Sequence, residues 1–462
     1  MQENYGMIMA AGHGKRMKSR LPKVLHPVCG KPMIERLIQV AQAASGKRPI
    51  VIVGVGKEQV MEAIGDRADF AVQEEQKGTG HAVMMAREYL VGKKGYVAIL
   101  AGDMPLLKAE TVEEMFSRCR EESLDALVLT SMQEDPTGYG RVIRDSVGNV
   151  LHIVEEKDAT DEERQVQEVN ASVYCFDIEK LLPALDNLKN DNAQGEYYLP
   201  DVIGMLSPQG KVGALVVDAE ECLGVNDRVQ LAQAETTLRR RINEGYMMGG
   251  VSMIDPAHTY IEDGVVIGQD TVVYPGVHIR GNSAIGEGCT LDEGCVIVDS
   301  AVGDGCHIRS STLMEAKLGK DVTVGPYAYL RPGADVGDGA HIGDFVEIKN
   351  ATIGKGTKLP HLTYVGDAAV GEYCNIACGV VFANYDGLKK YQATVGNGVF
   401  LGCNVNLVAP VHVADGAYVA AGTTVAGEDV PPGALSVGRA KQYIKEGWAD
   451  EKRAKGELRD VY

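Results

Sequence analysis

The chain has 462 residues, which suggests two or three domains, and its net charge of −18 argues against nucleic acid or an anionic membrane as a partner. No run of 18 apolar residues is present, so we expect no membrane span. The first residues lack the basic segment and long apolar core of a signal peptide. Ten cysteines without a paired-spacing framework predict a reducing, cytoplasmic compartment.

Residues 1–227 are predicted to form an α/β domain, because strand-like and helix-like segments alternate through them. The expected strands are 6–9, 49–53, 97–101 and 126–130, and the expected helices are 33–45, 57–64, 76–90 and 109–122. This alternation is typical of a mostly parallel, doubly wound sheet. An amphipathic helix predicted over 228–244 suggests that residues 228–250 link this domain to the next.

A glycine-rich, basic loop follows the first predicted strand. Its sequence over 9–25 is MAAGHGKRMKSRLPKVL, and the segment 1–32 has a single acid, Glu3, against six basic residues: Lys15, Arg16, Lys18, Arg20, Lys23 and Lys31. Backbone N–H groups and cations in such a loop hold phosphates. The spacing fits neither a dinucleotide fingerprint nor a Walker loop. A solvated basic loop is the alternative interpretation.

Further polar residues lie near the ends of other predicted strands. Gln73 precedes the turn Gly78-Thr79-Gly80, and Asp103 comes just after the strand 97–101. Ligands of open α/β sheets bind at the carboxyl ends of the strands, so Asp103 is well placed for Mg²⁺. A lone Asp after a strand is also a common helix cap. Segments that could complete a site are 138–141, 154–157, Asn170 and 224–227.

From about Ile261 to Val425, aliphatic residues recur every six positions. The runs are Ile261, Ile267, Val273, Ile279, Ile285, Leu291; Leu318, Val324, Leu330, Val336, Ile342, Ile348; Ile353, Leu359, Val365; Val370, Ile376, Phe382; and, after an insertion at 388–394, Val395, Leu401, Leu407, Val413, Val419, Val425. A period of six is the hexapeptide signature of a parallel β-helix. A β-sandwich would instead show period-two alternation and turns about every 8–12 residues.

The repeat also predicts where each kind of residue lies in the β-helix, which we place over 251–437 before a charged, partly helical or disordered tail, 438–462. The aliphatic residues should fill the interior, and the glycine after them should supply a positive φ at the turn. Small residues four positions after the aliphatic one should fit beneath the next coil. Cysteines occupy this position at Cys289, Cys295, Cys306 and Cys374.

Some polar residues interrupt the hexapeptides, although a scaffold does not need them. Arg331 and Lys349 are 18 residues apart, about one coil, so we expect them to stack. Two stacked cations suit a sugar phosphate. His361 is expected further round the helix, and a histidine there suits a general base, although a surface turn residue is the alternative.

These motifs together resemble known transferase families. Residues 9–25, 78–82, 102–106, 138–141, 154–158 and 224–226 are similar to the motifs of sugar-nucleotide pyrophosphorylases. With the β-helix behind them, nearly the whole chain resembles the bifunctional N-acetylglucosamine-1-phosphate uridyltransferase/glucosamine-1-phosphate acetyltransferases. The resemblance implies that acetyl-CoA acetylates glucosamine 1-phosphate in the second domain. UTP and Mg²⁺ would then serve uridylyl transfer in the first domain, yielding a precursor of peptidoglycan and lipopolysaccharide.

The same resemblance implies roles for residues of the first domain. Arg16 and Lys23 would neutralise the triphosphate during catalysis, and Asp103 and Asn226 would hold Mg²⁺. The residues expected to bind the nucleotide or sugar are Met9, Ala10, Ala11, Gly12, Lys23, Gln73, Gly78, Thr79, Ala101, Gly102, Asp103, Gly140, Glu155, Asn170 and Asn226.

For the second domain the resemblance implies a left-handed β-helix that assembles as a homotrimer, with acetyl-transfer sites between subunits. His361 would take the proton of the substrate amine. The residues expected to bind the amino-sugar phosphate are Arg331, Lys349, Tyr364 and Asn375, and those expected to line the acetyl-CoA site are Cys378, Asn384, Tyr385, Cys403, Ala421 and Arg439. The family commonly has alanine or serine where this chain has Cys378 and Cys403.

Two other functions are compatible with parts of this pattern. One is a sugar-1-phosphate nucleotidyltransferase whose β-helix only trimerises or regulates it, as in glucose-1-phosphate adenylyltransferases. His361, Lys349 and the inserted loop argue against that function. The other is a purely structural scaffold, which would need neither the basic glycine-rich loop nor Asp103.

Overall fold

The computed structural model describes residues 3–208 and 210–459. They form two compact units that divide between Glu244 and Gly245. Within the described residues, no helix has the length and apolar character needed to cross a membrane.

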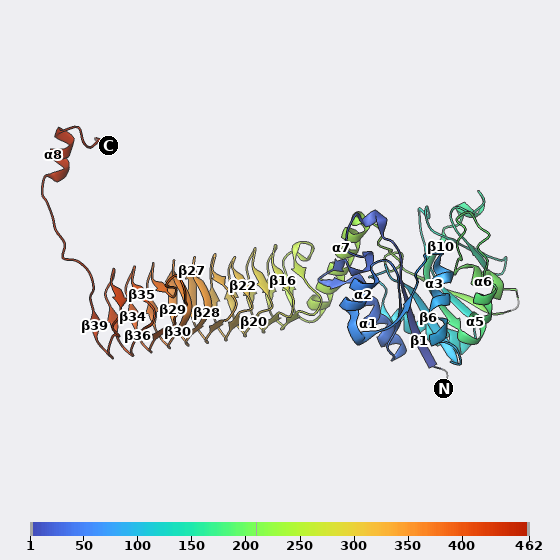
Figure 1. Cartoon of the computed structure of the whole chain (residues 1–462), viewed down its shortest axis with the longest axis horizontal. Coiled ribbons are helices and arrows are strands. Elements are labelled where there is room, and N and C mark those ends of the chain that lie inside the picture. Colours follow the sequence, from blue (N-terminus) through green and yellow to red (C-terminus); the bar gives the residue numbers. More distant parts are fainter. Residues whose placement is uncertain (1–2, 209, 460–462) are drawn as a thin grey trace. The chain divides into compact units, whose positions relative to one another are not determined.

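The first unit is built on one mixed sheet with the strand order β11-β7-β10-β6-β1-β4-β5 (Figure 1). These strands are β1 (Glu3–Ala10), β4 (Ile50–Val53), β5 (Asp69–Val72), β6 (Gly95–Ala101), β7 (Ala126–Met132), β10 (Glu168–Asp177) and β11 (Val212–Val217). All neighbours are parallel except β10, which is antiparallel to β6 and β7. A ribbon of β8 (Arg141–Arg144) and β9 (Val150–Val154) extends from β10.

Helices cover both faces of this sheet, as the doubly wound prediction requires. On one face lie α1 (Met33–Ser45), α2 (Lys57–Ile64) and α4 (Ala109–Glu122), and their Ile34, Val60 and Phe116 join one apolar core. On the other lie α3 (Thr79–Met85), α5 (Ile178–Asp186) and α6 (Asp201–Leu206), which bring Val83, Leu181 and Ile203 into a second core. The predicted fold class of this unit is therefore confirmed.

The helix predicted over 76–90 is wrong at both ends. The α-helix α3 begins only at Thr79 and is followed by a separate 3₁₀ turn, η4 (Arg87–Tyr89). Gly78, just before α3, has φ 105°, and a Cβ atom there would lie 2.5 Å from the carbonyl oxygen of Tyr197. Because the backbone of residues 195–197 passes so close, residues 76–78 form a loop rather than a first helical turn.

A long helix, α7 (Arg228–Met248), runs across the boundary between the two units and ends four residues later than predicted. Its Ala234 is fully buried in a small apolar cluster with Val28, Met33, Leu106 and Val225. The predicted linker helix therefore packs on the first unit through Ala234, with Leu231 and Leu238 partly buried against the same cluster.

The second unit is a solenoid of stacked coils, seen as the regular row of short strands in Figure 1. Each coil contributes strands to three parallel columns, shown by the pairings of β15 (Val272–Val273) with β18 (Thr290–Leu291), β16 (His278–Arg280) with β19 (Val296–Val298), and β17 (Ala284–Ile285) with β20 (Ala301–Val302). The parallel β-helix prediction is confirmed. The predicted aliphatic residues are all buried except Ile267, which is partly exposed, and the four cysteines at small positions are buried.

The glycine directly after the aliphatic residue does not have the role that we expected from the repeat. Gly286 does not have a positive φ; a Cβ atom there would lie 2.6 Å from the backbone nitrogen of Asp304 on the next coil. The positive φ, 63°, belongs to Gly288, two residues later. Close stacking of successive coils therefore requires the first glycine, and turn conformation favours the second.

The inserted loop begins earlier than predicted. It leaves the helix after β32 (Val381–Ala383) and returns at β33 (Ala393–Val395), where Ala393 and Thr394 already pair with Ala368 and Ala369. The loop therefore comprises residues 384–392 rather than 388–394. Beyond the last coil, the described part of the tail, which ends at residue 459, contains one helix, α8 (Trp448–Ala454).

Candidate active sites

A cavity of about 430 Å³ opens beside the carboxyl ends of β1 and β6 in the first unit. Every residue that we expected to bind nucleotide or sugar lines it: Met9, Ala10, Ala11, Gly12, Lys23, Gln73, Gly78, Thr79, Ala101, Gly102, Asp103, Gly140, Glu155, Asn170 and Asn226. Arg16 does not line this cavity. It is exposed and lines an adjoining hollow together with Gly12, Lys23 and Asn226.

The basic loop folds back on itself and places Lys23 at the cavity. Its 3₁₀ turn η1 (Lys15–Met17) lies between two left-handed residues, Gly14 and Lys18. A Cβ atom on Gly14 would lie 2.7 Å from the Cβ of Lys23, so only glycine permits this approach. Arg228 of α7 supports the loop, because its Nε donates a hydrogen bond of 3.2 Å to the carbonyl oxygen of Met17.

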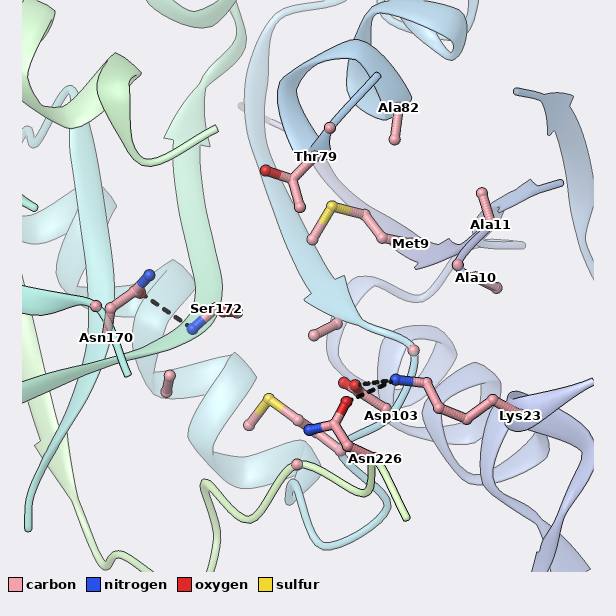
Figure 2. Close-up of a pocket in the computed structure, with 18 of the residues that line it drawn as sticks. Met9, Ala10, Ala11, Lys23, Thr79, Ala82, Asp103, Asn170, Ser172 and Asn226 are labelled. Carbon is pink, nitrogen blue, oxygen red and sulfur yellow. Dashed lines mark hydrogen bonds and ion pairs between the residues drawn. The ribbon is translucent and has the colours of Figure 1, made fainter. Parts of the chain in front are cut away.

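Lys23, Asp103 and Asn226 meet in the cavity, as Figure 2 shows. The ammonium Nζ of Lys23 lies 2.5 Å from Asp103 Oδ2 and 3.1 Å from Asn226 Oδ1. Asp103 is not a helix cap, because α4 begins only at Ala109. One carboxylate and one amide oxygen therefore converge on a single cation. These are the hard ligands that Mg²⁺ prefers, usually with water and substrate phosphates completing its shell.

Hydrogen bonds at the start of α7 hold Asn226 in position. Its backbone N–H donates to Oε1 of Gln230 at 2.8 Å. Asp227 caps the helix, since its Oδ1 accepts from the backbone N–H groups of Val229 and Gln230, both at 2.9 Å. The backbone N–H of Val225 donates to the carbonyl oxygen of Asp103 at 2.8 Å. This bond holds the chain segment of Asn226 next to that of Asp103. Sequence reasoning missed Gln230, because its spacing to Asn226 carries no motif.

A fixed amide lies at another wall of the cavity. Gln73 is 3% exposed, and its Nε2 lies 3.1 Å from the carbonyl oxygen of Gly78 and 3.0 Å from Nδ1 of His81. Thr79 accepts the backbone N–H of Leu199 at 3.0 Å through its Oγ1. The two bonds of Gln73 orient its amide before any ligand binds.

The third wall carries Glu155 and Asn170. The Oδ1 of Asn170 accepts the backbone N–H of Ser172 at 3.0 Å (Figure 2). Its Nδ2 donates to the hydroxyl of Tyr174 at 2.7 Å. Burial raises the pKa of Glu155, and nearby carboxylates add to that effect. Cavity residues that lie outside the motif segments, and that sequence reasoning therefore missed, are Gln76, Ala171, Ser172, Glu196 and Cys222.

We expect Glu155→Gln to raise the melting temperature of the first unit at neutral pH. Because the folded-state pKa of Glu155 is raised, the ionised carboxylate destabilises the fold at any pH above that pKa. The gain should shrink as pH falls and vanish below the usual glutamate pKa of about 4.3, where both states are protonated. Thermal unfolding over a pH series measures it. Glu134→Gln, at an exposed position, is the control, and an equal or pH-independent gain there would contradict this explanation.

In the second unit, Arg331 and Lys349 occupy neighbouring coils in register. Tyr329 and Leu330 of β25 pair with Glu347 and Ile348 of β28 (Glu347–Ile353), and the next residues along are Arg331 and Lys349. The following coil has Gly366 at this position, where an added Cβ would lie 2.3 Å from the hydroxyl of Tyr364 and 2.7 Å from Nδ2 of Asn384. Tyr364 and Asn384 thus extend the column of polar groups.

The inserted loop adds a cation that sequence reasoning did not assign. Lys349 lowers the pKa of Lys390, because the two ammonium groups are neighbours. Lys390 also lines a cavity of about 440 Å³ with Asn350 and Asp367. Among the described residues, those predicted for acetyl transfer lie outside the lining of this cavity.

His361 lies at the end of β29 (Lys358–His361), on a different column of strands from Lys349. Its Nδ1 is 2.5 Å from Oδ1 of Asp344, the in-register residue of β27 (His341–Asp344). This hydrogen bond lowers the pKa of Asp344. With Nδ1 engaged, Nε2 is the ring nitrogen that can accept a proton from a substrate. Asp344 was missed, although it lies one coil before His361.

The remaining predicted residues lie in several places on the β-helix. Asn375 shares the column of His361 but begins its strand, opposite Lys358. Cys378, Cys403 and Ala421 follow the same corner in successive coils. Tyr385 is exposed in the inserted loop, and Arg439 in the tail donates from Nη1 to the carbonyl oxygen of Ala421 at 3.3 Å. In a single chain, the residues predicted for acetyl transfer are thus spread along the surface of the β-helix, the inserted loop and the tail.

Comparison with known proteins matches both units. The model of the MobA-like NTP transferase domain matches residues 6–191, and the model of six bacterial transferase hexapeptide repeats matches 264–299 and 315–350. The chain is 51% identical over 451 residues to the bifunctional protein GlmU of Clostridium botulinum, covering 97% of this chain and 98% of the relative. It is 49% identical to that of Listeria monocytogenes over the same shares, and 50% identical to that of Caldanaerobacter subterraneus over 99% of this chain and 100% of the relative.

Proposed function

The chain belongs to the family of bifunctional GlmU proteins, transferases that make UDP-N-acetylglucosamine for the cell wall, and we propose that each of its two units carries one of the two reactions. It acetylates glucosamine 1-phosphate with acetyl-CoA, and it transfers UMP from UTP to N-acetylglucosamine 1-phosphate with release of pyrophosphate. The β-helix would perform the first reaction, and the α/β unit would perform the second.

The convergence of Lys23, Asp103 and Asn226 supports uridylyl transfer in the first unit. A sugar phosphate oxygen attacks the α-phosphorus of UTP, and pyrophosphate leaves. This reaction needs alignment and charge neutralisation more than a covalent nucleophile. Lys23 and Arg16 would neutralise the phosphates, the fixed amide of Gln73 would contact uracil, and Glu155 and Asn170 would hold the sugar.

Asp103 and Asn226 would hold Mg²⁺ in this reaction. The fit rests on their two oxygens, which converge on the Lys23 ammonium and so can share one cation. When bound, the ion supplies charge neutralisation for the phosphates. Lys23 would then be released from Asp103 to contact phosphate oxygens itself.

The hydrogen-bonded pair of His361 and Asp344 supports acetyl transfer in the second unit. The amine of glucosamine 1-phosphate must lose a proton as it attacks the thioester carbon, and coenzyme A leaves as the thiol. His361 would accept that proton at Nε2, while Asp344 stabilises the imidazolium that forms. Arg331 and Lys349, stacked on neighbouring coils, would bind the phosphate, and a β-helix with only a regulatory role needs none of these groups.

Exposed apolar side chains next to His361 support a homotrimer with sites between subunits. Tyr327, Phe345 and Leu362 follow one corner of the β-helix in successive coils and are 63%, 56% and 56% exposed. Each has a positive φ, which is costly for bulky residues, and the rings of Tyr327 and Phe345 stack with centroids 5.5 Å apart. A second copy of the chain packed on this corner would bury them and border His361.

We expect the double variant Tyr327→Glu, Phe345→Glu to dissociate the trimer, because burying two carboxylates in an apolar interface is unfavourable. Light scattering should show a shift from trimer mass toward monomer mass, with loss of acetyl transfer and little loss of uridylyl transfer. Tyr373→Glu is a matched control, since Tyr373 is 62% exposed with φ 56° but stacks against Gly356 on another corner. A wild-type monomer, or a double variant that stays trimeric, would refute the interface.

One assay tests both activities. The purified chain is incubated with glucosamine 1-phosphate, acetyl-CoA, UTP and Mg²⁺, and mass spectrometry follows the acetylated sugar phosphate and the UDP-sugar. Omitting acetyl-CoA should stop both products, and omitting UTP should leave only the acetylated sugar phosphate. We also propose a cytoplasmic location, supported by ten cysteines that are all free.

A further inference from the structure

Two cysteines occupy the same corner of neighbouring coils in the second unit. Asn375 and Ile376 of β31 (Asn375–Ile376) pair with Phe400 and Leu401 of β34 (Phe400–Leu401). Two residues beyond each strand stand Cys378 and Cys403. The backbone N–H of Asn404 donates to the carbonyl oxygen of Cys378 at 2.9 Å, so the register continues through the turn.

The turn conformation confirms that the two side chains leave the helix at equivalent points. Each cysteine is followed by a residue with positive φ, Gly379 at 76° and Asn404 at 55°. The coil before them has Leu362 at 46° in this place, preceded by His361. Cys378 and Cys403 therefore continue the column of Asp344 and His361 along one corner.

Exposure distinguishes this pair from the other stacked cysteines of the β-helix. Cys378 is partly exposed and Cys403 is exposed. Cys289 and Cys306 also stand on neighbouring coils in register, but they are 0% and 1% exposed, and their sulfurs donate to the carbonyl oxygens of Gly303 and Gly319. Only thiols that solvent reaches are oxidised readily, so the two pairs should react differently.

We propose that Cys378 and Cys403 form a surface dithiol that a peroxide oxidises to a disulfide between neighbouring coils. Hydrogen-bonded parallel strands lie about 4.8 Å apart, within the Cα separation of about 4.4–6.8 Å that a disulfide spans. The shared register and turn conformation place the two cysteines at equivalent points of one corner on adjacent coils, which is the arrangement that a disulfide between coils requires.

The oxidation consumes one peroxide for each dithiol. One cysteine, as the thiolate, attacks a peroxide oxygen; the O–O bond breaks, and a sulfenic acid and water form once the released oxygen takes a proton. The second thiol then attacks the sulfenic sulfur, the S–O bond breaks, and a second water leaves. Two electrons pass from the sulfurs to the peroxide, and the two thiol protons end in water.

The disulfide would switch off acetyl transfer without affecting uridylyl transfer. This consequence rests on the proposed function of the second unit, in which both cysteines line the acetyl-CoA site next to His361. A disulfide shortens the sulfur–sulfur separation to about 2.05 Å and removes both thiols from the surface that the coenzyme would contact. The first unit has its own cavity, so its reaction should continue.

The test treats the full-length chain with hydrogen peroxide, removes the oxidant with catalase, and maps peptides by mass spectrometry without reduction. We expect one linked peptide pair containing Cys378 and Cys403, lighter by two hydrogen atoms, and no link between Cys289 and Cys306. Acetyl transfer should fall in proportion to the linked fraction and return after dithiothreitol, while uridylyl transfer keeps its rate. Cys378→Ala and Cys403→Ser, each compared with its own untreated rate, should lose the peroxide-induced, reversible inactivation.

Several outcomes would overturn the proposal. Separate sulfinic acids at the two cysteines without a link would show that the thiols do not meet. Equal reversible inactivation of Cys403→Ser would place the sensitive group elsewhere. An untreated chain without acetyl transfer would contradict the proposed function instead, and the peptide map, which needs no activity, would still decide whether the dithiol forms.

Discussion

Replacing His361 with alanine should lower the turnover of acetyl transfer by about 10²–10⁴-fold, the usual effect of removing a positioned general base. The Michaelis constant for glucosamine 1-phosphate should change far less, because Arg331 and Lys349 remain to bind the phosphate. Uridylyl transfer should be unchanged, since it belongs to the other unit. Steady-state acetylation over a pH series measures the effect.

Two further variants sharpen this prediction. Asp344→Asn keeps the shape but removes the charge that stabilises the imidazolium, so it should lower turnover and leave the Michaelis constant for glucosamine 1-phosphate little changed. His412→Ala is the control, because His412 is an exposed histidine on a different column of the β-helix from His361. Its Nδ1 lies 2.7 Å from Oγ1 of Thr394 on the neighbouring coil. Near-normal turnover of His361→Ala at neutral pH would mean that another group takes the proton.

Replacing Asp103 with alanine should lower uridylyl transfer at least about 10²–10³-fold, the effect of removing one preorganised charge-stabilising group. Asp103 is the carboxylate that shares a cation site with Asn226, and no other carboxylate among the described residues contacts Lys23 by a hydrogen bond or ion pair. Acetyl transfer should be spared. Asp103→Asn, which keeps an oxygen but not the charge, should also lose activity, and excess Mg²⁺ should restore it better than it restores Asp103→Ala.

Asp177 offers a matched control, because it also ends a strand of the same sheet. Its Oδ1 caps α5 by accepting the backbone N–H of Glu179 at 2.8 Å, and it does not line the cavity. Asp177→Ala should therefore lower the free energy of unfolding by about 0.5–2 kcal/mol and leave the uridylyl rate near normal. Loss of both activities in a folded Asp103→Ala variant, or equal uridylyl loss in Asp177→Ala, would contradict the assignment of Asp103.

The sequence by itself determined the architecture of both units, because each fold repeats a local pattern. A six-residue period can bury its aliphatic residues only in a coil with short flat faces, and all of the repeating aliphatic residues from Ile261 to Val425 except Ile267 are buried. The alternation of strands and helices determined the doubly wound sheet. Because ligands of open α/β sheets bind at the carboxyl ends of the strands, the sequence also predicted that the glycine-rich loop and Asp103 lie at the same edge of the sheet.

Tertiary structure alone decided the partners that complete each site. Asp344 bonds His361, and Lys390 approaches Lys349 from the inserted loop, yet neither partner belongs to a motif or to the hexapeptide pattern. Such contacts join residues that are far apart in the sequence or on neighbouring coils. Local propensity carries no information about them. The same holds for Gly286, whose role depends on how closely the next coil stacks, and for Gly78, where the returning chain at Tyr197 ends the helix.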